Sequence, residues 1–150
     1  MRQRAHRWRA RLLTVLLLGG SVLARSAPDT SELGPIHVID LAHPSFTRHV
    51  DLSEDPAAFD FVQIRIVQVI NPQRIGVLFE VAFLADGGAR VRLGSFSLFP
   101  SDKPGQFIVA TQHRVRSSGS IVVSLLTAQP VEPSTPLTIG IGSVALIKSR

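Results

Sequence analysis

Two neighbouring stretches decide the fold of this chain: residues Phe59–Ile70 read FDFVQIRIVQVI, and residues Ile75–Ala85 read IGVLFEVAFLA. Both are rich in β-branched and aromatic residues, and both alternate broadly in polarity with the period of two that a strand requires. In the first stretch Val62 and Ile64 are expected to share a face with Ile70. The second is apolar on both faces, which predicts a central strand covered on both sides.

Further strand signals surround these two. They are expected over residues Pro35–Leu41, Arg48–Leu52, Ala89–Phe99, Gln106–Gln112, Ser120–Ala128 and Leu137–Ile147. The tripeptide Asp86-Gly87-Gly88 predicts a hairpin turn. The apolar parity shifts at Gly94, and a second shift is expected at Gly142, which predicts two β-bulges. No helical period follows residue 24. The sequence therefore predicts an all-β fold, an antiparallel β-sandwich of about seven to eight strands, with a barrel as the alternative.

The first 24 residues have the pattern of a secretory signal peptide. Arginines precede the apolar run Leu12–Leu18, and Val22-Leu23-Ala24 supplies small residues for cleavage. The apolar part, Leu12–Ala24, is shorter than the roughly 20 residues of a spanning helix. Because no Arg-Arg pair is present, a Sec-type route to the periplasm or the exterior is expected. Residues 25–34 are then a flexible lead-in, and residues 35–150 form one β-sandwich domain.

Charge and cysteine content exclude several classes of protein. Of 16 Lys and Arg, five lie in residues 1–24, so 11 remain against 11 Asp and Glu. A neutral chain lacks the surplus of cations that nucleic acids and anionic membranes attract, so no nucleic-acid partner is expected. Membrane contact is expected only through an uncleaved leader. The chain has no Cys, so export does not serve disulfide formation.

Three histidines, His37, His43 and His49, lie six residues apart and are candidate ligands for copper or zinc. Six residues of one strand extend roughly 20 Å, too far for a shared ion. The chain must therefore fold back near Pro44 for two of them to meet. We expect no cofactor, with copper binding by these histidines as the alternative.

Signatures of catalysis are missing from the sequence, and we expect no enzymatic activity. There is no Gly-x-Ser-x-Gly elbow for a serine nucleophile. His113, beside Arg114 and Arg116, is the base that a small hydrolase would have to use outside the histidine cluster. Arg90 and Arg92 lie on a predicted strand and are candidate contacts to a protein partner.

One run of residues resembles a known family. Gly94-Ser-Phe-Ser-Leu-Phe99 is similar to the "Gly-Ser-x-x-Leu-Phe" strand of the β-sandwich domain that follows the dicopper domain in tyrosinase-like proteins. Ile121–Leu126 and Leu137–Leu146 are similar to the last two strands of that domain, so the resemblance covers roughly residues 60–147. It implies a module that packs on a copper enzyme or covers its site. Such an enzyme needs six histidines on a helical bundle, whereas four follow the leader here.

Two functions follow from these observations. The first is an exported, non-catalytic accessory module that binds a protein partner, with a tyrosinase-like copper enzyme as the partner that the resemblance implies. The second is a periplasmic or secreted copper-handling protein that uses His37, His43 and His49.

Overall fold

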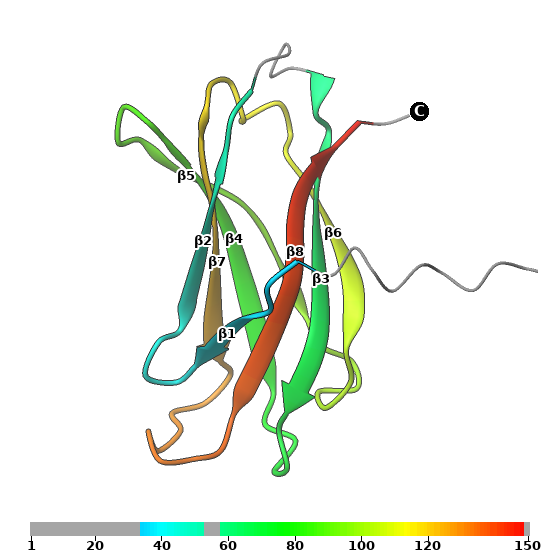
Figure 1. Ribbon diagram of the computed structural model, residues 1–150. Helices are drawn as coiled ribbons and strands as arrows, with labels where there is room; N and C mark the ends of the chain where they lie inside the picture. The colour runs from blue at the N-terminus through cyan, green and yellow to red at the C-terminus, as the bar shows by residue number, and fades with distance from the viewer. Residues whose placement is uncertain (1–33, 53–57, 149–150) are drawn as a thin grey trace, which may run out of the picture.

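A computed structural model describes residues 34–52 and 58–148, which fold into antiparallel β-strands (Figure 1). The strands are β1 (His37–Asp40), β2 (Ser45–Val50), β3 (Phe61–Ile70), β4 (Val77–Ala85), β5 (Arg90–Ser97), β6 (Gly105–Ala110), β7 (Gly119–Thr127) and β8 (Thr138–Ile147). The described residues contain no α-helix, so the predicted all-β class is confirmed. The predicted leader and all but the last residue of the predicted lead-in lie outside the described residues. No helix of the described part is long and apolar enough to cross a membrane.

The strands form two four-stranded sheets that pack face to face (Figure 1). The first sheet has the order β1-β8-β3-β6 and the second the order β2-β7-β4-β5. The predicted hairpin is present, since β4 pairs with β5 and the N–H of Gly88 donates to the carbonyl of Ala85 over 2.8 Å. All the remaining connections between consecutive strands cross from one sheet to the other. This strand order is that of a jelly roll, an eight-stranded form of the sandwich.

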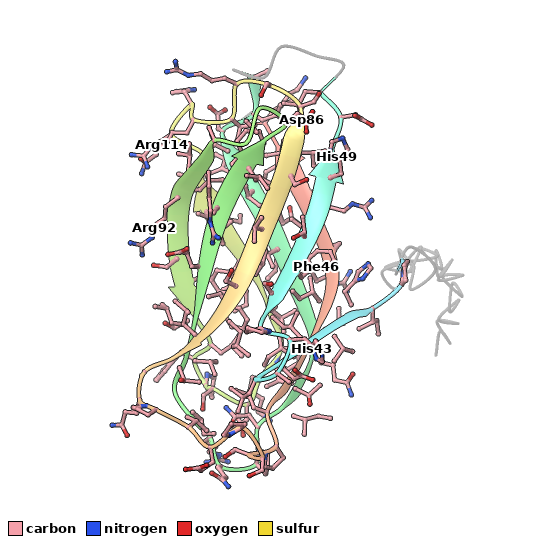
Figure 2. All side chains as sticks on the ribbon, turned by 90° about the vertical axis from the view of Figure 1, so that its left-hand side faces the viewer. His43, Phe46, His49, Asp86, Arg92 and Arg114 are labelled. Atoms are coloured by element: carbon pink, nitrogen blue, oxygen red, sulfur yellow. The ribbon has the colours of Figure 1, made fainter. Side chains whose placement is uncertain are left out.

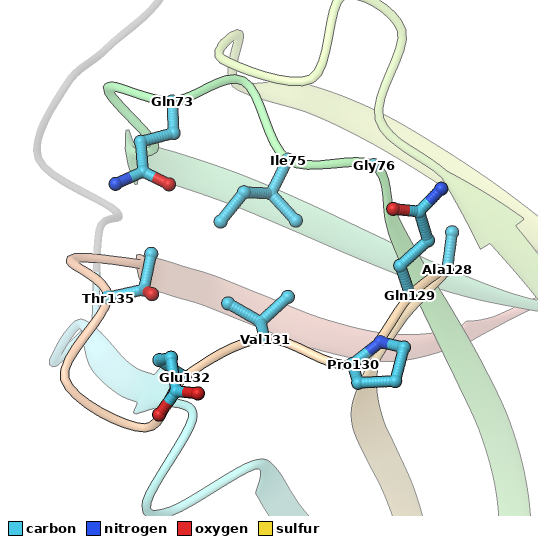
Figure 3. A pocket seen from close by; sticks show the side chains of 9 residues that line it. All are labelled: Gln73, Ile75, Gly76, Ala128, Gln129, Pro130, Val131, Glu132 and Thr135. Atoms are coloured by element: carbon cyan, nitrogen blue, oxygen red, sulfur yellow. The ribbon is translucent and has the colours of Figure 1, made fainter.

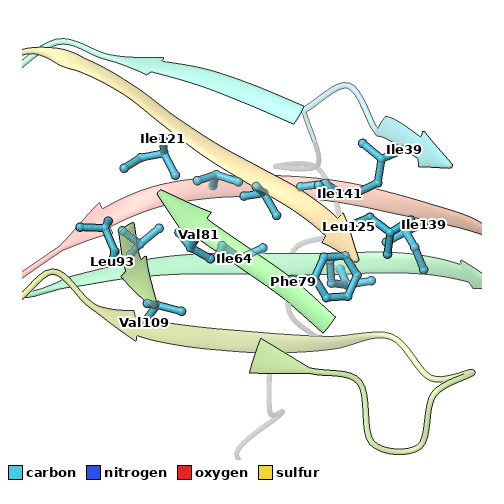
Figure 4. Packing of buried hydrophobic residues seen from close by; sticks show 14 of the residues in the cluster. Ile39, Ile64, Phe79, Val81, Leu93, Val109, Ile121, Leu125, Ile139 and Ile141 are labelled. Atoms are coloured by element: carbon cyan, nitrogen blue, oxygen red, sulfur yellow. The ribbon is translucent and has the colours of Figure 1, made fainter. Parts of the chain in front are cut away.

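The core lies between the two inner faces (Figure 4). Phe79 and Val81 of β4 face Ile64 of β3 and Ile141 of β8, and all four side chains are buried. Apolar burial of this kind contributes about 1.5–3 kcal/mol for each large side chain. The alternation seen in the sequence thus supplies two matched apolar faces, which hold the sheets together without a disulfide.

Both predicted bulges are present. The register of β4 and β5 shifts where Val81 lies opposite Gly94, and the register of β3 and β8 shifts across Gly142. A Cβ on Gly142 would come within 2.5 Å of a methyl of Val67, so glycine is required where the two strands approach most closely. A second register shift, at Val67 of β3 opposite Gly142, explains a wrong prediction. Ile70 was expected to share the buried face of Val62 and Ile64, but it is 46% exposed, because this shift reverses the parity of β3.

Two further predictions were wrong. The strand β4 is central in its sheet, but no described element covers its second face, because the fold has two layers rather than three. The strand expected at Arg48–Leu52 begins earlier, at Ser45. The reason is that the chain turns earlier than Pro44, at Asp40–His43, where the Asp40 carboxylate accepts backbone hydrogen bonds.

Three phenylalanines close one edge of the sandwich. Phe96 of β5 stacks on Phe79 of β4 at 4.8 Å between ring centroids and on Phe107 of β6 at 4.3 Å. Since β5 belongs to the second sheet and β6 to the first, this stack joins the two layers. Stacked aromatic pairs contribute about 0.5–1.5 kcal/mol beyond the area they bury.

We expect Phe79→Ala to lower the free energy of unfolding by about 3–5 kcal/mol, because it leaves a cavity and removes one ring of the stack. Phe99→Ala is the matched control, since Phe99 is 99% exposed. The measurement is urea unfolding followed by far-UV circular dichroism, because the sequence has no Tyr and its one Trp is Trp8. Equal losses in the two variants would contradict the packing described here.

Candidate functional site

The three candidate metal ligands lie in separate surroundings. The ring of His37, on β1, packs on Phe46 of β2 at 4.5 Å between centroids. His43 lies in the turn after β1, with Nδ1 3.4 Å from Oδ1 of Asp40. His49 is near the other end of β2, with Nε2 3.1 Å from Oδ1 of Asp51. Figure 2 shows His43 and His49 near opposite ends of β2. Within residues 34–52 and 58–148, no group of three or more His, Cys, Asp or Glu is arranged to hold a metal ion.

The turn between β1 and β2 is organised by a carboxylate. Oδ1 of Asp40 accepts the N–H of His43 over 2.6 Å and the N–H of Ala42 over 2.9 Å. The hydrogen bond from the His43 backbone, helped by the one from Ala42, holds the pKa of the Asp40 carboxyl below its usual value of 3.8. The chain does fold back before Pro44, but this turn sends β1 and β2 into different sheets.

The two candidate partner-binding arginines lie together on the second sheet. Nη2 of Arg90 is 3.2 Å from Oε1 of Glu80, and Nε of Arg92 is 3.5 Å from Oε2 of the same carboxylate. Arg114 reaches across from the β6–β7 loop and donates to the carbonyl of Arg92 over 2.8 Å. Figure 2 shows Arg92 and Arg114 beside β5, at one margin of the sheet. These contacts fix the arginine side chains and occupy a backbone acceptor of an edge strand.

The outer face of the second sheet, which points away from the core, has an apolar centre. Across β4 and β7, Leu78 lies opposite Leu126 and Ala82 lies opposite Val122, and between these two pairs Glu80 lies opposite Ser124. Ala82 and Val122 are buried. Leu126 is 44% exposed, and Leu84 of β4 is 37% exposed. The flanking strands supply polar side chains on the same face: Ser45, Thr47 and His49 from β2, and Arg90, Arg92, Ser95 and Ser97 from β5. The sequence pattern shows these apolar residues, but it does not show that Leu84 and Leu126 are exposed.

A hollow of about 540 Å³ lies between the β3–β4 and β7–β8 loops (Figure 3). Ile75 and Val131 point toward one another across it, and Gln73, Gln129 and Glu132 place polar groups around them. The first loop is held by the buried Asn71, whose amide group bonds to the N–H and the carbonyl of Ile75. The hollow combines apolar walls with amide groups and a single carboxylate.

A second hollow, of about 230 Å³, lies at the edge where β1 begins. It is lined by Gly34, Pro35, His37, Phe46, Arg48, Gly142, Ser143 and Val144. His37 is the one predicted site residue in this set. Arg48 was missed by the sequence analysis, although an arginine two residues from both Phe46 and Val50 breaks the apolar alternation of a strand.

His113, the base that a hydrolase would need, lies in the β6–β7 loop with a φ of 55°. Its N–H donates to Oγ1 of Thr111 over 3.3 Å, and its carbonyl accepts from Nε of Arg116 over 3.2 Å. Both contacts involve the backbone, and no described residue hydrogen-bonds to the imidazole. The geometry therefore adds no nucleophile or orienting carboxylate to this histidine.

Comparison with known proteins gives no further guide to function: no family model, no curated protein and no solved structure matches the chain.

We expect neither Cu²⁺ nor Zn²⁺ to raise the unfolding midpoint of the protein saturably, because the histidines do not converge. A ligand that binds the native state alone would raise it. The unfolding midpoint is measured by circular dichroism melts over a range of metal concentrations. A saturable rise that His43→Ala abolishes would restore the copper-handling function, and Phe99→Ala serves as the control variant.

We expect Asp40→Ala to lower the unfolding midpoint near pH 7 and to lose this effect in acid. Because folding lowers the pKa of Asp40, its carboxylate stabilises the fold above about pH 3.8. That stabilisation is lost as the pH falls through the lowered value. Melts of both proteins from pH 7 to pH 2 give the difference at each pH.

Asp40→Asn keeps an oxygen acceptor for the turn and removes the titration, so its difference from the wild type should be smaller than that of Asp40→Ala at pH 7 but should change with pH in parallel. A constant difference for Asp40→Ala down to pH 2 would contradict the turn described here.

Proposed function

We propose that this protein is an exported, non-catalytic interaction module, and that it binds a protein partner through the outer face of its second sheet. The observation that carries this proposal is a pair of exposed leucines on that face, Leu84 and Leu126. Leu126, Leu78 and Leu84 lie there, and no described element covers them.

The arrangement of the face supports this function. Protein interfaces combine an apolar centre, depleted in charge, with a polar margin that contains arginine. Here β4 and β7 form the centre, where the carboxylate of Glu80 is paired with Arg90 and Arg92. These two arginines on one side, and Thr47 and His49 on the other, form the margin. Arg90 and Arg92 are already held by Glu80, so they lose little side-chain entropy on binding.

The charge of the face indicates the chemistry of the partner. Two arginines share the single carboxylate of Glu80, which leaves a positive charge at the β5 margin. A partner with an acidic patch beside an apolar surface would match it in sign.

The resemblance of residues 60–147 to the sandwich domain of tyrosinase-like proteins makes a copper enzyme of that class the first partner to test. In this function the module would pack on a separate enzyme and contribute no copper ligand of its own. The affinity for this partner would come from side chains of the sheet face, and no cofactor would take part in binding.

We expect Leu126→Glu to weaken binding to the partner by at least about tenfold, because it buries a charge at the apolar centre. The partner is found by photo-crosslinking from position 126 in the export compartment. It is then purified, analysed for copper, and bound to the module in isolation by calorimetry.

Ile108→Glu is the matched control, because Ile108 is 56% exposed but lies on the outer face of the first sheet. The proposal is wrong if both glutamate variants bind the purified partner as tightly as the wild type. If the partner contains no copper, the proposal of an interaction module stands, but the proposal of a tyrosinase-like partner is wrong.

A further inference from the structure

The two edges of the sandwich are closed to different extents. At one edge the aromatic stack joins β5 and β6. At the other edge β1 pairs with β8 only over Thr138–Ile141. The rest of β8, Gly142–Ile147, lies beside β3 on one side, and no described strand pairs with it on the other. We refer to this side of Gly142–Ile147 as the open edge.

The sequence explains why the pairing of β1 with β8 does not extend to residues before His37. Continuing the register of β1 and β8 would place Ile36 opposite Gly142 and Pro35 opposite Ser143. Proline has no N–H and cannot extend the ladder of hydrogen bonds. Figure 1 shows the described chain crossing over β8 before β1 rather than running beside it. Among the described residues, therefore, no strand pairs with the backbone of β8 along the open edge.

The hollow of about 230 Å³ lies between the open edge and β2. Phe46 and Val144 supply apolar walls, and the His37 ring, packed on Phe46, borders it where β1 begins. Because a water molecule takes about 30 Å³ in the liquid, this volume is enough for one long side chain. No carboxylate lines it.

Arg48 has the core-facing parity of β2, where the pattern calls for an apolar residue, but its side chain is exposed. Its register partner on β7 is Ile121, which is fully buried, and its neighbours on the same side of β2 are Phe46 and Val50. The guanidinium has no hydrogen bond or ion pair with any described residue. Arg74 and Arg90, by contrast, each have an acidic partner.

We propose that the open edge binds an extended peptide segment of another protein by strand addition, and that Arg48 selects a segment with an acidic side chain. An added strand takes its main-chain hydrogen bonds from the sheet and its specificity from pockets for alternate side chains. Beside Val144, whose side chain faces the core, one side chain of the added strand points into the hollow. Its methylene groups would contact Phe46, and its carboxylate would reach Arg48.

The position of Arg48 also accounts for selectivity. A charge on the inner side of an edge strand discourages pairing with neutral strands, because the charge would be buried without a partner. An acidic side chain removes that cost by forming an ion pair with the guanidinium. The same residue thus rejects most exposed strands and accepts an acidic one.

This site lies at an edge of the first sheet, apart from the outer face of the second sheet, so the inference does not depend on the proposed function. Leu126→Glu is expected to leave peptide binding unchanged, and the two proposals can therefore fail separately.

The test uses the exported protein and the peptide acetyl-TVTETVT-amide, in which Val, Glu and Val share one face of a strand. The comparison peptide has Gln in place of Glu. We expect saturable binding of the Glu peptide by calorimetry, at least about tenfold tighter than that of the Gln peptide. Amide shifts in NMR spectra of the labelled protein should be largest over Gly142–Ile147.

Three variants of the protein and one modified peptide test the separate parts of the site. Arg48→Ala should reduce binding of the Glu peptide to that of the Gln peptide, whereas Arg65→Ala, which removes an arginine from the outer face of the first sheet, should not. Arg48→Glu should reverse the preference toward a Lys peptide. Methylation of alternate peptide amides should abolish binding, because it removes the strand hydrogen bonds.

The inference is overturned if the Glu and Gln peptides bind equally, if Arg48→Ala has no effect, or if nothing binds up to about 1 mM. Melts of each variant confirm that it folds. If the protein instead forms a dimer through this edge that the Glu peptide does not displace, a second copy is the occupant and the proposal is wrong.

Discussion

A strand at the edge of a sheet leaves backbone N–H and C=O groups that no neighbour satisfies, and the structure depends on how each such edge is treated. At the β5–β6 edge, the stacked rings of Phe79, Phe96 and Phe107 join the sheets, and Arg114 occupies the carbonyl of Arg92. The Gly94 bulge lies in the same strand. This edge is closed by side chains and by backbone irregularity together.

The opposite edge is closed only where β1 reaches. Four residues of β1 pair with β8, and Pro35 prevents the ladder from extending further. The difference between the two edges follows from local sequence, because one has three aromatic residues and the other has a proline followed by a short strand. Without cysteine, packing and hydrogen bonds alone must hold the edges.

Much of this fold could be predicted from the sequence because the information is local. Most strand positions, the hairpin at Asp86–Gly88 and the bulges at Gly94 and Gly142 follow from alternation and from glycine. The order of strands could not be predicted, since six of the connections cross between sheets and crossing leaves no mark in the polarity pattern. For the same reason β4 was expected to be covered on both faces: its residues are apolar on both, but the number of layers is a property of the whole chain.

The candidate site was predictable to a similar extent. Arg90 and Arg92 lie exposed on the strand where the pattern placed them, but their shared carboxylate, Glu80, is on another strand. The histidines could not be placed without knowing that the Asp40 turn sends β1 and β2 into different sheets. Arg48 was missed because β2 was expected to begin at that residue, which hid its alternation with Phe46.

The strand β2 links the two surfaces for which binding is proposed. Because side chains alternate along a strand, Thr47 and His49 point to the outer face of the second sheet, while Phe46 and Arg48 point toward the hollow at the open edge. A partner on the outer face and a strand at the open edge would therefore contact opposite sides of β2, through alternate residues. Since β2 pairs only with β7, its position is less constrained than that of an inner strand. Ordering of β2 by one ligand would lower the entropic cost of binding the other, so the arrangement favours positive coupling between the two surfaces.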